Sequence, residues 1–503
     1  MDLKNLLKKY RLLFNIASNF FSIAVNLLIG VFMAPYLIKK LGIEMYGIIA
    51  LVNTFPPYIQ IFTNGLSNST TKYMSISLEK GDNDDANAYF NTSINILFKF
   101  IIGLFPLVLL LSIYTPVIFN IPVNGESESK LLVFLVLLAT FVNILQAPIS
   151  SVYQICHRFL QKNIILVFSK LTAFALLLFL FQNYAPEAWF VGLYQLAITI
   201  ISVLLLSSHY RKFQNIFSFK KSLYKFEIFK EIRGLGLWNS VNDIAVLFFL
   251  MINQVLINKY LGVLESALFG PVLILISLAT LGSGAISNVI MPFIYRDIAV
   301  NKNQQLLEIK LFLISKVLVY FMGLPVMIMI VFTNEILLLW LGSDFVVISF
   351  VLRCFLISLF FGGILFLPYS HFFRGRDKIK IPAIVNLIFG IFNIVLILIF
   401  FKLNLGLSSV AYSFVFTFGL RGVFFNTIYL SIVGNNTFLN NFKRIFRLVF
   451  FLMTTFYLLY LLNLSDLNFY SKIVMTSLLY IGIIFLVGLN KNDKESLILL
   501  IKK

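Results

Sequence analysis

Four cations lie inside stretches of sequence that are otherwise apolar enough for the interior of a lipid bilayer. A lysine or arginine at the centre of a bilayer costs roughly 2.5–3.5 kcal/mol on insertion scales, and such residues usually pair with another group or face water. Arginine also presents a planar fork of donors that matches phosphate oxygens. These residue types therefore predict a cavity that binds an anion, and the residues are Lys99, Lys316, Arg353 and Arg421.

One carboxylate, Asp243, lies as deep in an apolar stretch as these cations. A deep acid can bind a proton or a metal cation, or it can pair with a nearby Lys or Arg. Lys170 adds a fifth cation to the set. With five cations against one acid, the predicted cavity favours an anionic ligand over a cationic one.

An alternative stays open for the lysines. If the apolar region begins near Ile94, Lys99 lies only about five residues inside it, or roughly 7–8 Å at 1.5 Å rise per residue. A lysine at that depth can extend its ammonium group to the polar boundary of the membrane. The sequence does not decide between a cavity and this boundary position for Lys99, Lys170 or Lys316.

Polar residues form two further stripes at helical spacing. Residues at i, i+3, i+4 and i+7 share one face of a helix. The first stripe consists of Asn15, Ser18, Asn19, Ser22 and Asn26. Its counterparts later in the chain are Asn239, Ser240 and Asp243. These faces either line a cleft or hold helices together through interhelical hydrogen bonds, and both interpretations stay open.

The elements that carry these residues are expected to be membrane-spanning helices. The 503 residues are 60% hydrophobic and only 12% charged, whereas soluble domains are about 45–50% apolar and about 25% charged. A bilayer interior of about 30 Å requires about 20 apolar residues per helix. The sequence predicts an all-α polytopic membrane protein with about fourteen spans, at 12–38, 45–70, 88–118, 129–156, 163–182, 188–208, 233–257, 264–293, 308–333, 344–373, 379–402, 406–432, 445–463 and 470–489.

The basic residues predict the orientation of these spans. With the N-terminus inside, 29 of the 40 Lys and Arg residues fall in inside segments, six in outside segments and five within spans. Cytoplasmic loops are enriched in Lys and Arg, so both termini are expected in the cytoplasm. This pattern accounts for the net charge of +19, and nucleic acid is not expected as a partner. The two cysteines and three histidines have no metal-site spacing, so no metal or cofactor is expected beyond H⁺ or Na⁺ as a coupling ion.

The second half of the chain repeats the first. Five short matches recur in the same order with offsets of 216 to 221, among them LIKKLG from Leu37 with LINKYLG from Leu256, KFIIGLFP from Lys99 with KVLVYFMGLP from Lys316, and RFLQK at Arg158 with RGRDK at Arg374. Such self-similarity indicates duplication. An even number of helices per half makes the two repeats parallel. The predicted parts are an N-terminal six-helix lobe at 1–210, a basic cytoplasmic linker at 211–232, a C-terminal six-helix lobe at 233–435, and a two-helix extension with a cytoplasmic tail at 436–503.

Prolines are expected to interrupt three of the spans. Pro56 and Pro57 lie in the second span, and Pro106 and Pro325 lie at matched places in the two halves. Proline removes a backbone donor and bends a helix. Each site is therefore either a hinge or a fixed bend.

Two stretches near the start carry a family resemblance, MAPYLIKKLGIEMYGIIALVN and KYMSISLEKGDNDDANAYFNTS. With the two six-helix halves and the terminal pair, they resemble Wzx-type O-antigen and capsule flippases. These belong to the polysaccharide-transporter branch of the MATE-like (MOP) superfamily, and the resemblance covers essentially the whole chain. It implies a non-enzymatic flippase in the bacterial inner membrane. Such a protein moves a polyprenyl-diphosphate-linked oligosaccharide from the cytoplasmic to the outer leaflet by alternating access.

The resemblance also implies coupling to a cation gradient, with Asp243 as the candidate coupling residue. No G-x-x-x-x-G-K-[ST] phosphate loop occurs in the sequence. In transporters built from repeats, substrate binds between the repeats. The cations Lys99, Lys316, Arg353 and Arg421 are expected to hold the diphosphate and any acidic sugars there. Expected partners are the lipid-linked oligosaccharide, membrane lipids, and polymerase and chain-length proteins of the same pathway.

Two other function classes are kept as alternatives. A multidrug or other lipid-linked-precursor exporter of the same superfamily would share the fold, but a carrier of cationic drugs requires an acid-rich cavity. A membrane glycan polymerase requires a large outer loop that carries catalytic groups, whereas the predicted outer loops are all short.

Overall fold

The structure is a computed structural model, and it describes residues 11–122, 125–156, 158–210, 218, 226–300, 304–376, 378–434, 436–462 and 468–488. Most of the predicted linker, 211–225 apart from Ser218, lies outside the described residues. The side chains of Asn15 and Asn239 also lie outside them, although both residues belong to helices.

The described residues form helices and contain no strand. The helices of the first half are α2 (Arg11–Leu41), α3 (Ile43–Val52), α4 (Phe55–Glu79), α5 (Asn83–Ile118), α6 (Glu126–Ile155), α7 (Phe159–Asn183) and α8 (Trp189–Tyr210). Those that follow are α9 (Phe226–Phe249), α10 (Met251–Tyr260), α11 (Val263–Val300), α12 (Gln304–Val331), α13 (Thr333–Leu341), α14 (Ser349–Gly362), α15 (Leu367–Gly375), α16 (Lys380–Lys402), α17 (Ser408–Phe414), α18 (Arg421–Val433), α19 (Phe438–Leu462) and α20 (Phe469–Ile483). Short helical turns complete them: η4 (Ser343–Ile348), η5 (Ile364–Phe366), η6 (Val415–Leu420) and η7 (Ile484–Gly488).

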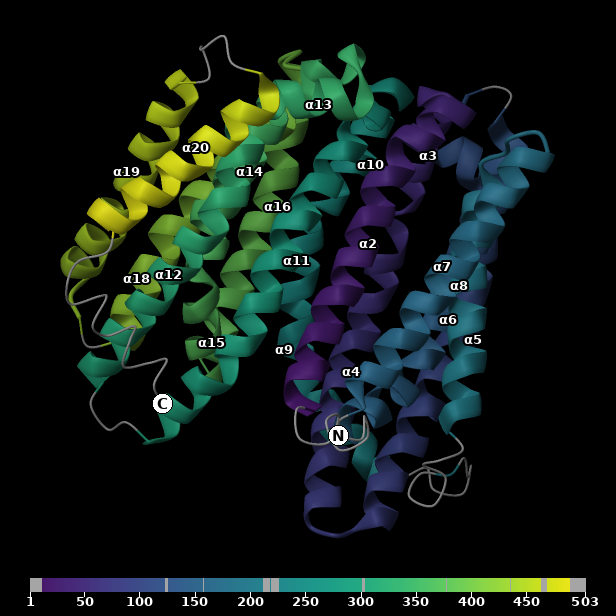
Figure 1. Cartoon of the computed structure of the whole chain (residues 1–503). Coiled ribbons are helices and arrows are strands. Elements are labelled where there is room, and N and C mark those ends of the chain that lie inside the picture. The colour runs from purple at the N-terminus through teal and green to yellow at the C-terminus, as the bar shows by residue number, and fades with distance from the viewer. Residues whose placement is uncertain are drawn as a thin grey trace, which may run out of the picture. The chain divides into compact units, whose positions relative to one another are not determined.

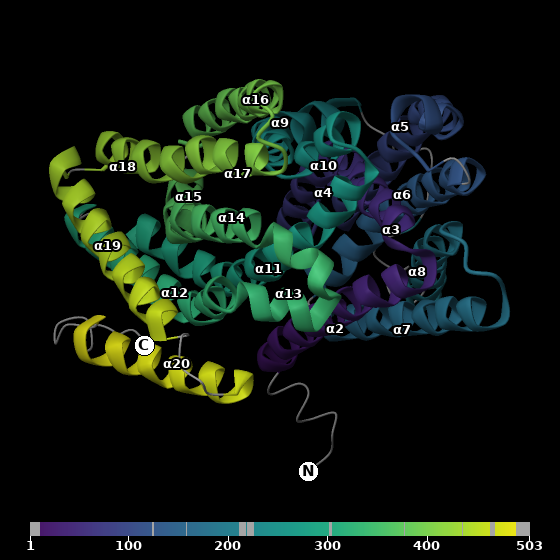
Figure 2. The same ribbon diagram turned by 90° about the horizontal axis from the view of Figure 1, so that it is seen from above.

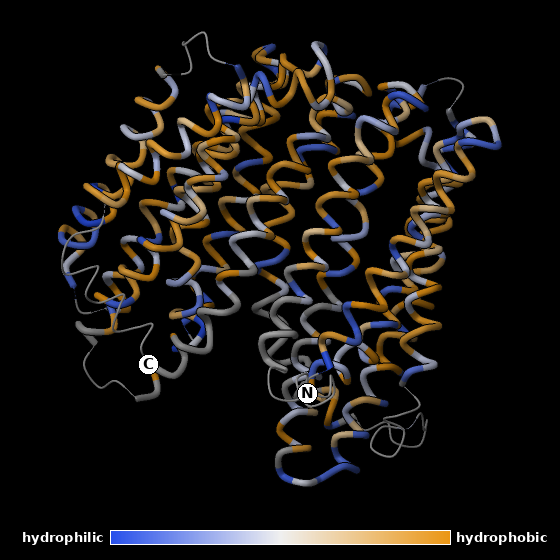
Figure 3. Tube along the Cα trace, viewed as in Figure 1, coloured by the Kyte–Doolittle hydropathy of each residue, from blue (hydrophilic) through white to orange (hydrophobic). Residues whose placement is uncertain are grey.

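Thirteen helical segments in the described part of the chain are long and apolar enough to cross a membrane. Apolar residues cover most of the length of the helices, and hydrophilic residues gather near their ends (Figure 3). The prediction of an all-α, polytopic membrane protein is confirmed. The predicted second span, 45–70, is the one that does not qualify, because it is divided between α3 and α4 and α4 is rich in hydroxyl residues.

The prolines have different effects at their three sites. Pro56 and Pro57 occupy the first turn of α4, where a missing N–H group has no helical partner to lose. They coincide with the break after Val52, as predicted. At Pro106 and Pro325, α5 and α12 continue as single helices, so these prolines do not end their helices. The hinge or bend expected at each of them stays a prediction. Membrane helices tolerate internal proline where local adjustments satisfy the freed backbone groups.

The chain divides into two compact units, Met1–Pro271 and Val272–Lys503, and the division falls inside α11. In the first unit, α6 packs against α4, α5 and α8, and α7 packs against α2 and α8 (Figure 1). The helices α9 and α10, which the repeat assigns to the second half, pack on α4 and α3 in this unit. The start of α11 also approaches α3 closely, since a Cβ atom at Gly47 would overlap the Val263 carbonyl and Ala267.

The second unit contains α12, α14 and the helices that follow. The last two helices, α19 and α20, lie next to α12 (Figure 2). Gly323 makes room for this contact, because a Cβ atom there would overlap the Tyr480 hydroxyl. The α18 backbone approaches α14 equally closely, at Gly422 and Gly362.

Matched turns support the internal repeat. Gly42 and Gly262 occupy equivalent positions in the two halves, and both have positive φ angles, 82° and 113°. Each accepts a hydrogen bond of 3.2 Å from the N–H four residues later, of Tyr46 and Ser266 respectively. Glycine adopts positive φ without a steric penalty, so both halves make this turn in the same way.

A second pair of turns refines the alignment of the repeats. The Arg158 N–H donates to the Tyr153 carbonyl at 2.7 Å, and the Lys378 N–H donates to the Phe373 carbonyl at 2.8 Å. The donors and the acceptors of these two bonds are separated by the same offset as the two glycines, Gly42 and Gly262. Arg158 therefore corresponds to Lys378 in this turn, whereas the sequence match paired it with Arg374.

Candidate functional site

Helix α4 is unusually rich in serine and threonine for a membrane helix. Most of these hydroxyl groups donate to carbonyls of their own helix, as Thr63 does to Gln60 at 2.9 Å and Thr70 does to Leu66 at 2.8 Å. Such back-bonding satisfies the hydroxyl hydrogen inside an apolar environment. The oxygen lone pairs stay available, so α4 can present a polar face without breaking its backbone hydrogen bonds.

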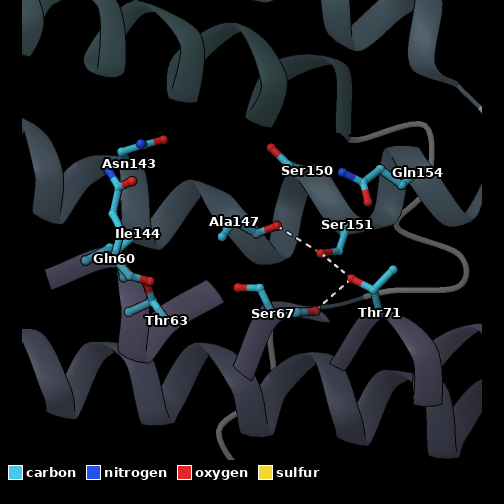
Figure 4. Close-up of a pocket in the computed structure, with 10 residues that line it drawn as sticks. All are labelled: Gln60, Thr63, Ser67, Thr71, Asn143, Ile144, Ala147, Ser150, Ser151 and Gln154. Carbon is cyan, nitrogen blue, oxygen red and sulfur yellow. Dashed lines mark hydrogen bonds between the residues drawn. The ribbon is translucent and has the colours of Figure 1, made fainter. Parts of the chain in front are cut away.

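A polar pocket of about 210 Å³ lies between α4 and α6 in the first unit (Figure 4). Its lining residues come from these two helices and are mostly hydroxyl or amide residues. They are Gln60, Thr63, Ser67, Thr71, Asn143, Ile144, Ala147, Ser150, Ser151 and Gln154. None of these ten residues is charged.

Hydrogen bonds join the two helices along one side of the pocket. Thr71 donates to the Ser151 hydroxyl at 2.8 Å and also lies 2.8 Å from the Ser67 carbonyl, while Ser151 donates to the Ala147 carbonyl at 3.1 Å (Figure 4). The Ser67 hydroxyl oxygen is buried and has no hydrogen-bond partner among the described residues. A buried hydroxyl without a partner costs about 1–3 kcal/mol, so a bound hydroxyl or amide group would stabilise this position.

An apolar cluster holds the pocket helices in place at the Thr71 end. Met74, Phe90, Val152 and Tyr153 are buried there with other residues of α4, α5, α6, α8 and α9. The Tyr153 hydroxyl donates to the Leu206 carbonyl at 2.9 Å, which fixes α6 against α8. The apolar cluster and this hydrogen bond therefore fix the positions of the helices that line the pocket.

The predicted stripe on α2 makes interhelical hydrogen bonds. Asn163 of α7 donates to the Ser18 hydroxyl at 3.0 Å and to the Asn19 side chain at 2.6 Å. Lys170 of α7 donates to Asn26 at 2.5 Å, about two helical turns further along both helices. These contacts favour the interpretation that the stripe holds helices together.

The same seam borders a second cavity, of about 440 Å³, in which Ser18 and Asn163 lie among apolar side chains such as Phe21 and Phe168. The other stripe residues lie apart from it. Ser22 is half-buried on α2, and Ser240 is buried on α9, where its hydroxyl lies 3.4 Å from the Ile61 carbonyl of α4.

The two predicted cavity lysines have different surroundings. Lys99 is exposed on α5, beside the exposed apolar side chains of Phe98 and Ile102. Lys316 is half-buried on α12, with its ammonium nitrogen 5.8 Å from the centre of the Tyr320 ring. The face of Lys316 packs on the C-terminal helices, because the Tyr320 hydroxyl donates to the Gly488 carbonyl at 3.0 Å.

Both predicted arginines bond to groups of their own unit. The Arg353 Nε donates to the Ile330 carbonyl at 3.1 Å, and its Nη2 lies 3.3 Å from the Asn334 side-chain oxygen. Arg421 is buried; its Nε donates to the Thr417 carbonyl at 3.2 Å and its Nη1 donates to Asn386. Lys99 belongs to the first unit, and Lys316, Arg353 and Arg421 belong to the second. The shared site expected for the four cations stays a prediction.

Two acidic residues of the described part of the chain, Asp243 and Glu308, have restricted exposure to solvent. Asp243 is half-buried on α9. Glu308, which the sequence placed at the boundary of a predicted span, is 3% exposed and accepts a hydrogen bond from Asn436. Glu308 is therefore a second acid with a restricted environment, and it lies at the end of its span and not deep inside it as predicted for Asp243.

Sequence reasoning missed most of the polar pocket. It noted Pro56 and Pro57 in the second span, but not that Gln60, Thr63, Ser67 and Thr71 follow these prolines on one face of α4 at helical spacing. On α6 the signal was the series Asn143, Ala147, Ser150 and Gln154. Each series becomes a site only because α4 lies against α6.

Comparisons with known proteins agree with this fold. No family model matches the chain. An "Uncharacterized membrane protein EpsK" of Bacillus subtilis (strain 168) is 24% identical over 428 residues, which cover 83% of this chain and 82% of that protein. A "Putative O-antigen transporter" of Shigella flexneri is 23% identical over 382 residues, which cover 73% of this chain and 86% of that protein.

Two solved structures match at the level of fold. The lipid II flippase MurJ, in an inward closed conformation, aligns with a TM-score of 0.67 at 17% identity, over 94% of this chain and 98% of that one. An inward-facing multidrug resistance MATE family transporter of the MOP superfamily aligns with a TM-score of 0.66 at 16% identity, over 85% and 95%. The predicted resemblance is confirmed: the chain is a multi-pass membrane protein that shares the fold of these MATE and MurJ structures, and over most of its length it is similar to a protein named as a putative O-antigen transporter.

Proposed function

We propose that this protein is a flippase of the bacterial cytoplasmic membrane. It moves a polyprenyl-diphosphate-linked oligosaccharide, such as an O-antigen or capsule repeat unit, from the cytoplasmic to the outer leaflet by alternating access. The observation that carries the proposal is the uncharged pocket of hydroxyl and amide groups between α4 and α6. Hydroxyl and amide groups are suited to hydrogen bonds with sugars, and a polar pocket in a membrane-spanning unit is costly unless it has such a use.

The proposal divides the substrate between different groups. The glycan occupies the polar pocket, and the prenyl tail stays in lipid. Of the four predicted cations, Lys99 is the best candidate to meet the diphosphate, because its side chain is exposed. Arg353 and Arg421 already donate to backbone carbonyls. In this proposal these two arginines stabilise the packing of the second unit, and Lys316 contributes less than Lys99 to binding of the diphosphate.

Coupling to a gradient of H⁺ or Na⁺ is part of the proposal, with Asp243 as the ion-binding acid and both termini in the cytoplasm. Polymerase and chain-length proteins of the same pathway would act on the product. Gradient-driven export that is unchanged in Asp243→Asn would remove Asp243 from the coupling mechanism.

The test is deletion of the gene in its host, followed by complementation. Loss of a surface glycan, with its lipid-linked precursor accumulating inside, is the expected result. Ser150→Trp fills the pocket and should reduce export by at least tenfold, because a bulky ring displaces the bound sugar. Leu131→Trp is the matched control, since Leu131 is an exposed residue of the same helix outside the pocket.

The same strains separate this function from its main alternative. A multidrug exporter would leave the surface glycan and the precursor unchanged on deletion and would alter only the sensitivity of the cells to drugs. That outcome, with normal amounts of protein in the membrane, would overturn the proposal.

A further inference from the structure

The polar pocket of the first unit differs from the rest of the chain in its charge. The protein has a net charge of +19, yet none of the ten described residues that line the pocket carries a charge. A carboxylate taken from water into such surroundings loses its hydration and gains no counter-charge, which is costly. A neutral sugar loses only hydrogen bonds with water, and the pocket can replace them.

The arrangement of polar groups fits a ligand with several hydroxyl groups. Amide side chains lie on both lining helices, Gln60 on α4 and Asn143 and Gln154 on α6, with hydroxyl groups between them. The Ser67 hydroxyl is buried with no partner among the described residues. Ala147 leaves space where a larger side chain would close the pocket. Together these groups offer donors and acceptors over a short distance.

The size of the pocket limits how much of a glycan it can hold. Its volume of about 210 Å³ is below the range of about 300–1,000 Å³ that is typical of sites for drug-sized ligands. The pocket is also partly open to its surroundings. It therefore suits one sugar ring, and the adjacent sugars of an oligosaccharide would extend out of the pocket.

From these observations we infer that the α4–α6 pocket is a subsite for a single neutral sugar of the transported glycan, and that it selects against an acidic sugar at that position. The inference rests on the proposed function and adds a substrate class to it. Lys99 would meet the diphosphate, and this subsite would determine which repeat units are accepted.

The test uses host cells that lack their own flippase and make one of two lipid-linked repeat units. The two units differ at one sugar, which is a neutral hexose in the first and the corresponding uronic acid in the second. The full chain is expressed, its membrane level is measured, and surface glycan and internal precursor are quantified. The wild type should export the neutral unit at least tenfold faster, which corresponds to about 1.4 kcal/mol.

A charge-introducing variant provides the second arm. Gln154→Lys places a cation at the end of the pocket, where it can pair with a carboxylate, and should improve export of the acidic unit relative to the neutral one by about tenfold. Gln195→Lys is the matched control, because it adds the same charge to the same unit at a residue outside the pocket lining.

Each outcome has a distinct meaning. Equal export of both units by the wild type, or the same change of ratio in Gln154→Lys and Gln195→Lys, would overturn the subsite while leaving the flippase function intact. Export of neither unit, with normal membrane levels, would overturn the proposed function itself.

Discussion

The two compact units make a similar interhelical contact with different chemistry. In the first unit, Ser151 of α6 bonds to Thr71 of α4 at 2.8 Å. In the second unit, His371 of α15 occupies the position of the repeat that corresponds to Ser151, and it bonds to Ser287 of α11 at 2.6 Å. Both His371 and Ser287 are buried, whereas the Thr71 contact borders a pocket. The imidazole ring of His371 is larger than the hydroxyl group of Ser151, which lines the pocket.

The lysine-bearing helices show the same difference between the units. A Cβ atom at Gly103 of α5 would meet nothing within 4 Å, whereas one at Gly323 of α12 would overlap Tyr480. The second unit covers this face of α12 with its C-terminal helices, and the first unit leaves the face of α5 exposed. The two repeats therefore share their turns, whereas the first unit has the more accessible polar and small-residue surfaces.

The largest effect is expected from filling the covered face of α12. Gly323→Leu forces the new side chain into Tyr480, and overpacking of this kind costs about 1–3 kcal/mol or more. The melting temperature of the purified protein in detergent should fall clearly. Gly103→Leu is the matched change on α5 and should leave the melting temperature nearly unchanged. Equal effects of the two variants would show that the faces do not differ.

A smaller effect is expected from the buried contact of the second unit. His371→Leu leaves the Ser287 hydroxyl without this partner in an apolar environment, which costs about 1–3 kcal/mol. Adding Ser287→Ala should recover much of the loss, because replacing both partners by apolar groups can be nearly neutral. Thermal unfolding of the single and double variants measures this. A double variant as unstable as His371→Leu would refute the assignment of the loss to this hydrogen bond.

The smallest effect is expected at the similar contact of the first unit. Thr71→Val removes one hydrogen bond, while Ser151 can still donate to the Ala147 carbonyl. Hydrogen bonds between membrane helices contribute about 0.6 kcal/mol on average, so thermal stability should change little. A loss as large as that of His371→Leu would contradict the difference between the two contacts.

Local signals were sufficient to predict much of the fold. Hydropathy located the spans, and the positions of Pro56 and Pro57 marked the break between α3 and α4. Pro106 and Pro325 do not end their helices, because whether a proline breaks a membrane helix depends on how its surroundings satisfy the freed carbonyl. That information is not contained in the residue type.

The candidate site was harder to predict, because the residues that contact one another there are distant in sequence. The stripe on α2 was visible, but its partner Asn163 could be identified only once α7 was placed beside α2. The arginines illustrate a second limit. Ile330 lies in the last turn of α12, where carbonyls have no helical partner, and such an end attracts the Arg353 side chain. The charge of the arginines and their depth in the spans predicted that they bind a ligand. These two properties could not show that the fold itself supplies carbonyl groups that accept their hydrogen bonds.

The back-bonded hydroxyl groups of the pocket have a consequence for what a ligand must look like. The hydrogens of Thr63, Thr71 and Ser151 are already directed at oxygen atoms of the protein, so these groups can offer a ligand only lone pairs. A sugar that meets them must supply the hydrogens. Removal or methylation of its hydroxyl groups would then weaken binding more than inversion of a ring carbon that keeps them. Affinity would depend more on the number of free hydroxyl groups than on their stereochemistry.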